Sequence, residues 1–95
     1  MNKEEALRKL RTILPALTQK YPIEKLGIFG SVARGEQTPE SDLDIVAHFN
    51  GPIGWEFIDL ADELEKEMNC KVDLVSQKGI KPWYWNHIKS DILYA

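Results

Sequence analysis

Hydrophobic residues recur every three or four positions at the start of the chain, and this spacing predicts an amphipathic helix over residues 3 to about 19. Asn2 and Glu5 have the spacing of a capping box at its beginning. Tyr21 and Pro22 end the helix, because the residue before a proline is disfavoured in helical conformation. The apolar positions of the repeat are Leu7, Leu10, Leu14 and Leu17.

Three short segments have the pattern of β-strands. Residues 25–30 are apolar and closed by glycine, as in a buried strand that runs into a tight turn. Residues 71–76 also predict a short strand, and residues 42–49 alternate cleanly, which predicts a strand with one wet face. In this last segment the apolar face carries Leu43, Ile45, Ala47 and Phe49, and the wet face carries Asp42, Asp44, Val46 and His48.

Two further helices complete the pattern. Residues 55–68 are amphipathic with an acidic outer side, and Pro82 opens a last helix that we expect to continue to the chain terminus. The order is helix, strand, short turn or helix, strand, helix, strand, helix. It predicts one two-layer α+β domain over residues 1–95: a small mixed sheet of about three to four strands, helices packed on one face, and an opposite face that is partly open.

Composition limits the kinds of protein that this sequence can encode. With 95 residues, 43% of them hydrophobic, we expect a single modest core and no apolar run of the roughly 20 residues that span a membrane. The acidic N-terminus does not resemble a secretory signal, and the lone Cys70 suits a small buried residue, so we expect a cytoplasmic protein. The net charge of −3 provides no basic face, so direct binding of nucleic acid is not expected.

Three aspartates give the sequence its candidate chemistry. Asp42 and Asp44 lie two apart on one strand, roughly 6.6 Å along the backbone, and Asp73 on another strand could meet them on the same face. Two carboxylates about 4 Å apart repel each other by roughly 4 kcal/mol at an effective dielectric of 20, so such a cluster must take up protons or a cation. Oxygen ligands of this kind suit Mg²⁺, which commonly shares its remaining positions with substrate phosphates.

The stretch GSVARG, residues 30–35, could provide a cradle for those phosphates. Gly30 would allow a close approach of the backbone, and the amides of the turn, with the Ser31 hydroxyl, could point at an anion. Arg34 either adds a positive charge nearby or pairs with Glu36 or Glu40.

Taken together in this order, GSVARG, SDLDI and VDLV resemble the signature of the polymerase-beta-like nucleotidyltransferase superfamily. The small size makes the chain most similar to the minimal nucleotidyltransferases, the MNT-type antitoxins of HEPN/MNT toxin–antitoxin pairs. The resemblance implies that the sheet is palm-like. It also implies that Gly30 and Ser31 hold the nucleotide phosphates, that Asp42 and Asp44 bind Mg²⁺, and that Asp73 is the third carboxylate, which positions or deprotonates the attacking hydroxyl.

The resemblance further implies a reaction and a partner. The chain would transfer AMP from ATP to a tyrosine hydroxyl of a HEPN-domain toxin and silence it. Two alternatives stay open: an antitoxin that neutralises its partner by binding alone, and a nucleotidyltransferase that acts on a small molecule or RNA.

Aromatic residues cluster near the end of the chain. Trp83, Tyr84 and Trp85 cannot all face one core from a helix, so at least one must be exposed or covered by another chain. Because Trp and Tyr are enriched at interface hot spots, we favour a surface for a hetero-oligomeric partner. For His48 a solvated position at the strand end is expected, rather than one beside the carboxylates.

Overall fold

The first helix forms as the sequence predicts. The computed structural model describes all residues, 1–95, and places α1 at Lys3–Lys20. The Asn2 side chain accepts a hydrogen bond from the backbone N–H of Glu5 at 2.9 Å, which confirms the cap. Three residues that repeat at helical spacing, Ala6, Leu10 and Leu17, are buried against the sheet.

A four-stranded mixed sheet forms the centre of the molecule, and its strands lie in the order β3-β2-β1-β4. The central strand β1 is antiparallel to both β2 and β4, whereas β3 lies parallel to β2. The α+β sheet expected from the sequence is therefore present. The strands are β1 (Ile23–Phe29), β2 (Leu43–Phe49), β3 (Val72–Ser76) and β4 (Leu93–Tyr94).

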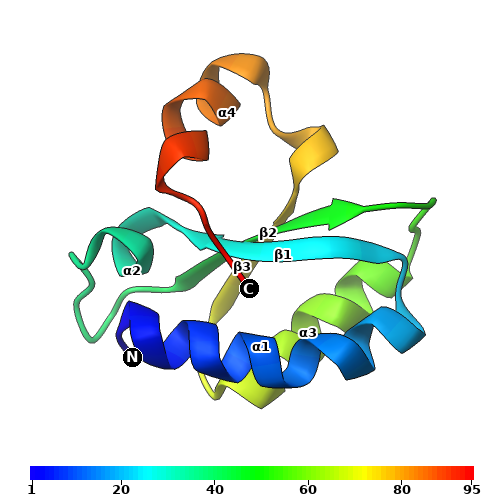
Figure 1. Ribbon diagram of the computed structural model, residues 1–95, viewed down its shortest axis with the longest axis horizontal. Helices are drawn as coiled ribbons and strands as arrows, with labels where there is room; N and C mark the ends of the chain where they lie inside the picture. The colour runs from blue at the N-terminus through cyan, green and yellow to red at the C-terminus, as the bar shows by residue number, and fades with distance from the viewer.

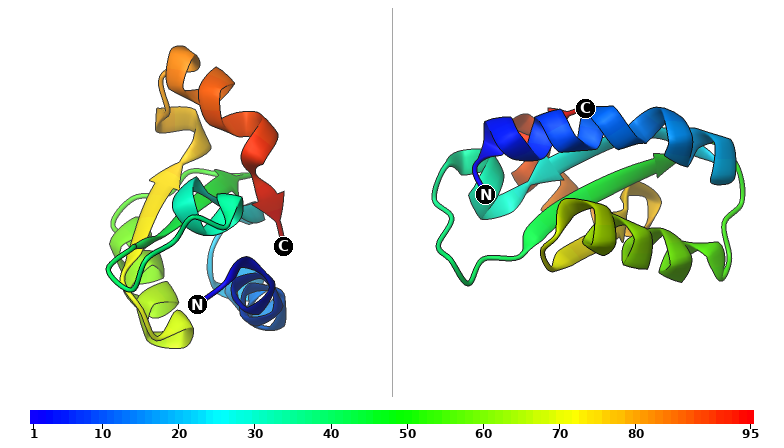
Figure 2. Two further views of the ribbon diagram at one scale, coloured as in Figure 1. Left: turned by 90° about the vertical axis from the view of Figure 1, so that its left-hand side faces the viewer. Right: turned by 90° about the horizontal axis from the view of Figure 1, so that it is seen from below.

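Helices cover the two faces of the sheet unequally. The helices α1 and α3 (Glu56–Met68) lie side by side on one face, and α4 (Pro82–Ile88) stands over part of the other (Figures 1 and 2). The larger core cluster lies beneath α1 and α3 and includes Leu26, Ile45 and Leu64, each fully buried.

A second, smaller cluster lies between the sheet and α4. It consists of Phe29, Val46, Ile88 and Ile92. The sequence placed Val46 on the wet face, and for this residue that expectation is wrong, because α4 covers it completely. The open part of this face is the end that carries the aspartates, where Asp73 is exposed.

The C-terminal segment departs most from the expectation. The last helix does not continue to the terminus: α4 ends at Ile88, and the turn η2 (Lys89–Asp91) leads into β4. The edge of β1 offers unpaired backbone groups, and the backbone N–H of Ala95 donates to the Leu26 carbonyl at 2.9 Å. Pairing with a distant strand outweighs the local preference for helix, which is weak over so few residues.

Two short helices complete the chain. Helix α2 (Gly30–Arg34) follows β1 directly and is the helical form of the turn expected after that strand, while η1 (Gln77–Gly79) connects β3 to α4. None of the helices has both the length and the apolar character that crossing a membrane requires.

The absence of a side chain at Gly27 makes room for β4. A Cβ atom at this position would lie 2.6 Å from Cγ2 of Ile92 and 2.9 Å from Cδ1 of Tyr94. We therefore expect Gly27→Ala to lower the free energy of unfolding by about 1–3 kcal/mol, the range for overpacking a tight site. Urea unfolding followed by circular dichroism measures the change.

Gly79→Ala is the matched control, because a Cβ atom there would meet nothing within 4 Å. It should change the unfolding free energy by less than about 0.5 kcal/mol. Equal stability of the two variants would contradict the close packing of β4 on Gly27.

Candidate active site

The three segments that the sequence selected come together at one edge of the sheet. Because β1 and β2 are antiparallel, the last residue of β1, Phe29, pairs with Asp44 near the start of β2. Because β3 is parallel to β2, Asp44 also pairs with Asp73 near the start of β3. The turn GSVARG leaves β1 at this same edge, so sequence spacing correctly predicted the neighbourhood of Asp44 and Asp73 on one face.

Gly30 lies directly against the Asp44 carboxylate. Its φ of +73° is a left-handed conformation that favours glycine, and a Cβ atom would lie 2.1 Å from Oδ2 of Asp44. Both the backbone conformation and the space therefore require glycine at this position. The contact brings the first amides of α2 next to the carboxylate edge.

Burial and like charges together shape the electrostatics of Asp44. The pKa of its carboxyl group is raised to about 6, chiefly by its half-buried position and then by the negative charges of Asp73 and Asp42, while the positive charge of Arg34 opposes them. Asp42 and Asp73 themselves are exposed. Proton uptake or a nearby cation would relieve this repulsion.

Arg34 combines the two roles considered for it, because it pairs with Glu36 and its charge also lowers the pKa of Asp44. Its Nε donates to Oε1 of Glu36 at 3.0 Å, and both side chains are largely exposed. A surface pair of this kind contributes little stability, so the guanidinium could exchange Glu36 for another anion at small cost.

Short backbone contacts hold the carboxylate edge together, and the sequence analysis did not identify them. The backbone N–H of Thr38 donates to Oγ of Ser41 at 2.9 Å, and the N–H of Leu43 donates to the Lys71 carbonyl at 2.9 Å. The first closes the loop before Asp42, and the second ties the beginnings of β2 and β3 together. The Thr-Pro-Glu-Ser stretch was the available signal for the first contact.

His48 does not belong to this edge. It lies toward the other end of β2, where its Nε2 is 2.8 Å from the Tyr94 hydroxyl, and burial lowers its pKa. The expectation of a solvated histidine is wrong, because β4, which the sequence did not predict, covers it. Its role is to hold the C-terminal strand.

The residues at the edge suit Mg²⁺ by their chemistry. No group of three or more His, Cys, Asp or Glu side chains is arranged to hold a metal ion within the chain alone. Mg²⁺, however, is usually bound through one or two carboxylates, with waters and substrate phosphates as the other ligands. Asp44 and Asp73 are adjacent oxygen donors whose mutual repulsion a cation would relieve, so Mg²⁺ at these residues, with Asp42, stays a prediction.

The raised pKa of Asp44 gives a prediction on stability. Its carboxyl titrates at about 6 in the folded chain against 3.8 in the unfolded one, so the folded state binds more protons between these values and loses stability as the pH rises through them. Because the side chain is only half-buried, screening reduces the effect to the order of 1 kcal/mol. Without divalent cations, Asp44→Asn should therefore be more stable than the unsubstituted chain at pH 8, and the gain should disappear toward pH 4.

Thermal melts in EDTA across this pH range measure the difference. An equal change at pH 4 and pH 8 would show that folding does not raise the pKa of Asp44.

Comparisons with known proteins agree with this geometry. The family model described as "Nucleotidyltransferase domain" matches residues 10–95. A relative from Methanocaldococcus jannaschii with the name "Putative protein adenylyltransferase MJ1379" is 42% identical in an alignment of 96 positions that covers 97% of this chain and 93% of the relative.

Two solved structures have the same fold. The first, "Structure of putative minimal nucleotidyltransferase", has a TM-score of 0.80 and 31% identity, and the match covers 98% of this chain and 95% of that one. The second, a crystal structure of the toxin–antitoxin MntA-HpeT, has a TM-score of 0.69 at 19% identity, covers 99% of this chain and 72% of that one, and supports the fold alone. The chain belongs to the nucleotidyltransferase domain family, among its minimal members.

Proposed function

We propose that this nucleotidyltransferase transfers AMP from ATP to a tyrosine hydroxyl of a partner protein of the HEPN toxin class, with Mg²⁺, and acts as its antitoxin. The observation that carries the proposal is the contact of Gly30 with Asp44 beside Asp73, because it joins a phosphate-binding backbone to two carboxylates. A protein acceptor is supported by the relative with 42% identity, whose name specifies a protein adenylyltransferase. The toxin partner is supported by the motif resemblance and by a relative from Thermococcus cleftensis, 31% identical over 94% of this chain, with the name "Protein adenylyltransferase MntA".

Each residue at the edge has a role in this reaction. The backbone at Gly30 and the Ser31 hydroxyl would bind the nucleotide phosphates, and Asp42 and Asp44 would hold Mg²⁺, which would supply positive charge to those phosphates. Asp73 orients the tyrosine hydroxyl and accepts its proton. The phenolic oxygen forms a bond to the α-phosphorus, the bond from this phosphorus to the bridging oxygen breaks, and pyrophosphate leaves with the electron pair.

One observation favours a second function, neutralisation of the partner by contact alone. Trp83 is 70% exposed on α4, as the sequence predicted for at least one of the three aromatic residues, and large exposed aromatics commonly anchor protein interfaces. Contact and transfer can also act together, since a bound partner presents its tyrosine at high effective concentration.

The intact mass of the partner tests the proposal. After incubation of the complex with ATP and Mg²⁺, we expect the partner to gain one or more AMP units. Asp44→Asn should reduce the rate of transfer at least about 100-fold, because the Mg²⁺ that would neutralise the phosphates loses a carboxylate ligand. Asp62→Asn, on the exposed side of α3, is the matched control and should transfer at the normal rate.

Three outcomes would contradict the assignment in different ways. Full transfer by both Asp42→Asn and Asp44→Asn would refute the carboxylate site. A bound partner without added mass would favour neutralisation by contact. Labelled nucleotide on RNA or on a small molecule without any partner would favour the third alternative.

A pair of glycine substitutions tests the close contact separately. Gly30 and Gly35 both have a φ of +73°, so alanine at either position costs about 1–2 kcal/mol of backbone strain. Only at Gly30 would the new methyl group displace Asp44, whereas at Gly35 it would meet nothing within 4 Å.

Gly30→Ala should therefore lose most of its transfer activity, and Gly35→Ala should retain it at temperatures where both remain folded. Transfer rates, with circular dichroism as the check on folding, distinguish them. Similar activity in the two variants would show that the Gly30–Asp44 contact is not needed for the reaction.

A further inference from the structure

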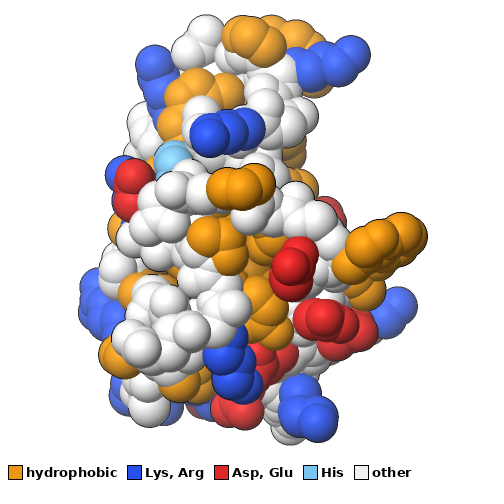
Figure 3. Space-filling view, turned by 90° about the vertical axis from the view of Figure 1, so that its right-hand side faces the viewer, with side chains coloured by type: hydrophobic (Ala, Val, Ile, Leu, Met, Phe, Trp, Pro, Cys, Tyr) orange, Lys and Arg blue, Asp and Glu red, His pale blue; other side chains and the backbone are white.

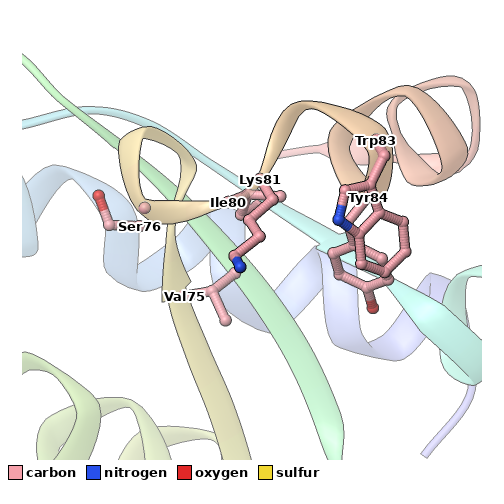
Figure 4. Close-up of a pocket in the computed structure, with 7 residues that line it drawn as sticks. Val75, Ser76, Ile80, Lys81, Trp83 and Tyr84 are labelled. Carbon is pink, nitrogen blue, oxygen red and sulfur yellow. The ribbon is translucent and has the colours of Figure 1, made fainter.

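An apolar hollow lies on the same face of the sheet as the carboxylates, further along β3. It has a volume of about 540 Å³ and opens between the end of β3 and the beginning of α4 (Figure 4). Val75 in its floor is two residues after Asp73, so both side chains are on one face of β3, roughly 6.6 Å apart along the strand. The residues that line it are Val75, Ser76, Gly79, Ile80, Lys81, Trp83 and Tyr84.

The strand order places the hollow on the side from which the acceptor would approach in the proposed reaction. The phosphate-binding turn follows β1, Asp44 is on β2, and Asp73 and the hollow belong to β3, so these features follow one another across the sheet. In an in-line displacement the nucleophile approaches the phosphorus from the side opposite the leaving group. If pyrophosphate leaves toward Gly30, the acceptor arrives from the β3 side, where the hollow lies.

Aromatic side chains form an exposed wall of the hollow. Trp83 and Tyr84 descend from the same end of α4 (Figure 4), 70% and 38% exposed, with their ring centroids 5.6 Å apart in a T-shaped arrangement. Ile80 and Val75 complete an apolar surface. Such a wall suits an aliphatic or aromatic side chain of a bound segment.

The charge around the hollow is positive, unlike the chain as a whole. Lys81 is the one charged residue in the lining, and its amine extends toward Val75 (Figure 4). Lys78 is likewise the one charged residue in the lining of the neighbouring hollow, which shares Ser76. Seen from the right of Figure 1, basic and hydrophobic side chains occupy the upper part of the surface, and acidic ones gather lower down (Figure 3).

We propose that this hollow binds the polypeptide segment that carries the acceptor tyrosine, and that it selects segments with an apolar side chain and a carboxylate next to that tyrosine. The proposal rests on the protein-acceptor reaction described above. Trp83 and Ile80 contact the apolar side chain of the bound segment, and Lys81 attracts its carboxylate. The tyrosine hydroxyl of the segment then lies at Asp73. These residues then set the specificity for the acceptor, separately from the residues that hold the nucleotide.

Synthetic pentapeptides are suitable probes. One peptide has aspartates at its ends and a central tyrosine between leucines, a second replaces the tyrosine with phenylalanine, and a third replaces the aspartates with lysines. The phenylalanine peptide cannot accept AMP, so its binding reports on the hollow without the chemistry. With the ¹⁵N-labelled chain we expect its amide shift changes to concentrate at residues 73–84.

Four variants separate the hollow from the rest of the surface. Trp83→Ala and Lys81→Glu should each weaken binding of the phenylalanine peptide about tenfold, and Lys81→Glu should improve binding of the lysine peptide. The matched controls are Trp55→Ala, at an 84% exposed tryptophan beside α3, and Lys89→Glu, at an exposed lysine outside the lining; both should bind like the unsubstituted chain. Binding of a non-hydrolysable ATP analogue should be the same in all four.

Transfer to the tyrosine peptide then distinguishes the two proposals. We expect Trp83→Ala and Lys81→Glu to raise KM for the peptide about tenfold with little change in kcat. Peptide binding at residues 73–84 without any transfer would refute the proposed reaction but not the hollow as a peptide site. Absent shifts at these residues, unchanged peptide affinity in both variants, or weaker binding of the ATP analogue would overturn the acceptor proposal, and the last would assign the hollow to the nucleoside.

Discussion

The contact between the backbone of Gly30 and the carboxylate of Asp44 is the constraint on which the rest of the site depends. It places a carboxylate oxygen where any other residue would have its Cβ atom, so the chain can leave β1 only through a glycine. The contact exists because Phe29 and Asp44 are paired across two antiparallel strands. Strand register therefore determines the distance between the turn GSVARG and the carboxylates.

The strand that carries Asp44 is held from both sides. Leu43 and Ile45 face the core beneath α1 and α3, and Val46 faces the smaller cluster beneath α4; all three are buried. A rigid strand can keep Asp44 half-buried and close to other negative charges, although burial of its charge and their repulsion destabilise the folded chain at neutral pH. Stability that the core provides is in this way used to maintain an electrostatically unfavourable site, as is common where a protein binds a cation or a charged substrate.

The parts of the fold that local pattern determines could be predicted from the sequence. Helix α1 has a strong repeat and a cap, and β2 alternates cleanly, so both were predicted to within a residue or two. The end of α4 and the strand β4 could not be predicted, because Leu93 and Tyr94 become a strand only by pairing with β1, more than 60 positions earlier. The burial of Val46 and the position of His48 depend on that same C-terminal segment, and both expectations failed for this reason.

In the candidate site, too, features that depend on local sequence pattern could be predicted, and features that depend on contacts between distant segments could not. The two-residue spacing predicted one face for Asp42 and Asp44, and the pattern of the strands predicted that Asp73 could meet them there. The register confirms that Asp44 lies beside Asp73. The exclusion of any side chain at Gly30 by Asp44 could not be predicted, because it depends on where a turn places one atom relative to a neighbouring strand. Arg34 was left with two roles because a surface arginine can pair locally or with a ligand, and sequence spacing does not distinguish them.

The separation of the molecule into two apolar clusters has a consequence for specificity. The larger cluster holds the strands and hence the carboxylate edge, whereas α4 packs mainly through the smaller one and is anchored by β4 and the Tyr94–His48 hydrogen bond. Substitutions on the exposed side of α4 therefore need not disturb the positions of Asp44 and Asp73. A nucleotidyltransferase built in this way can change the exposed surface of α4 while the geometry of the turn GSVARG and the carboxylates is kept, because the two parts share few packing contacts.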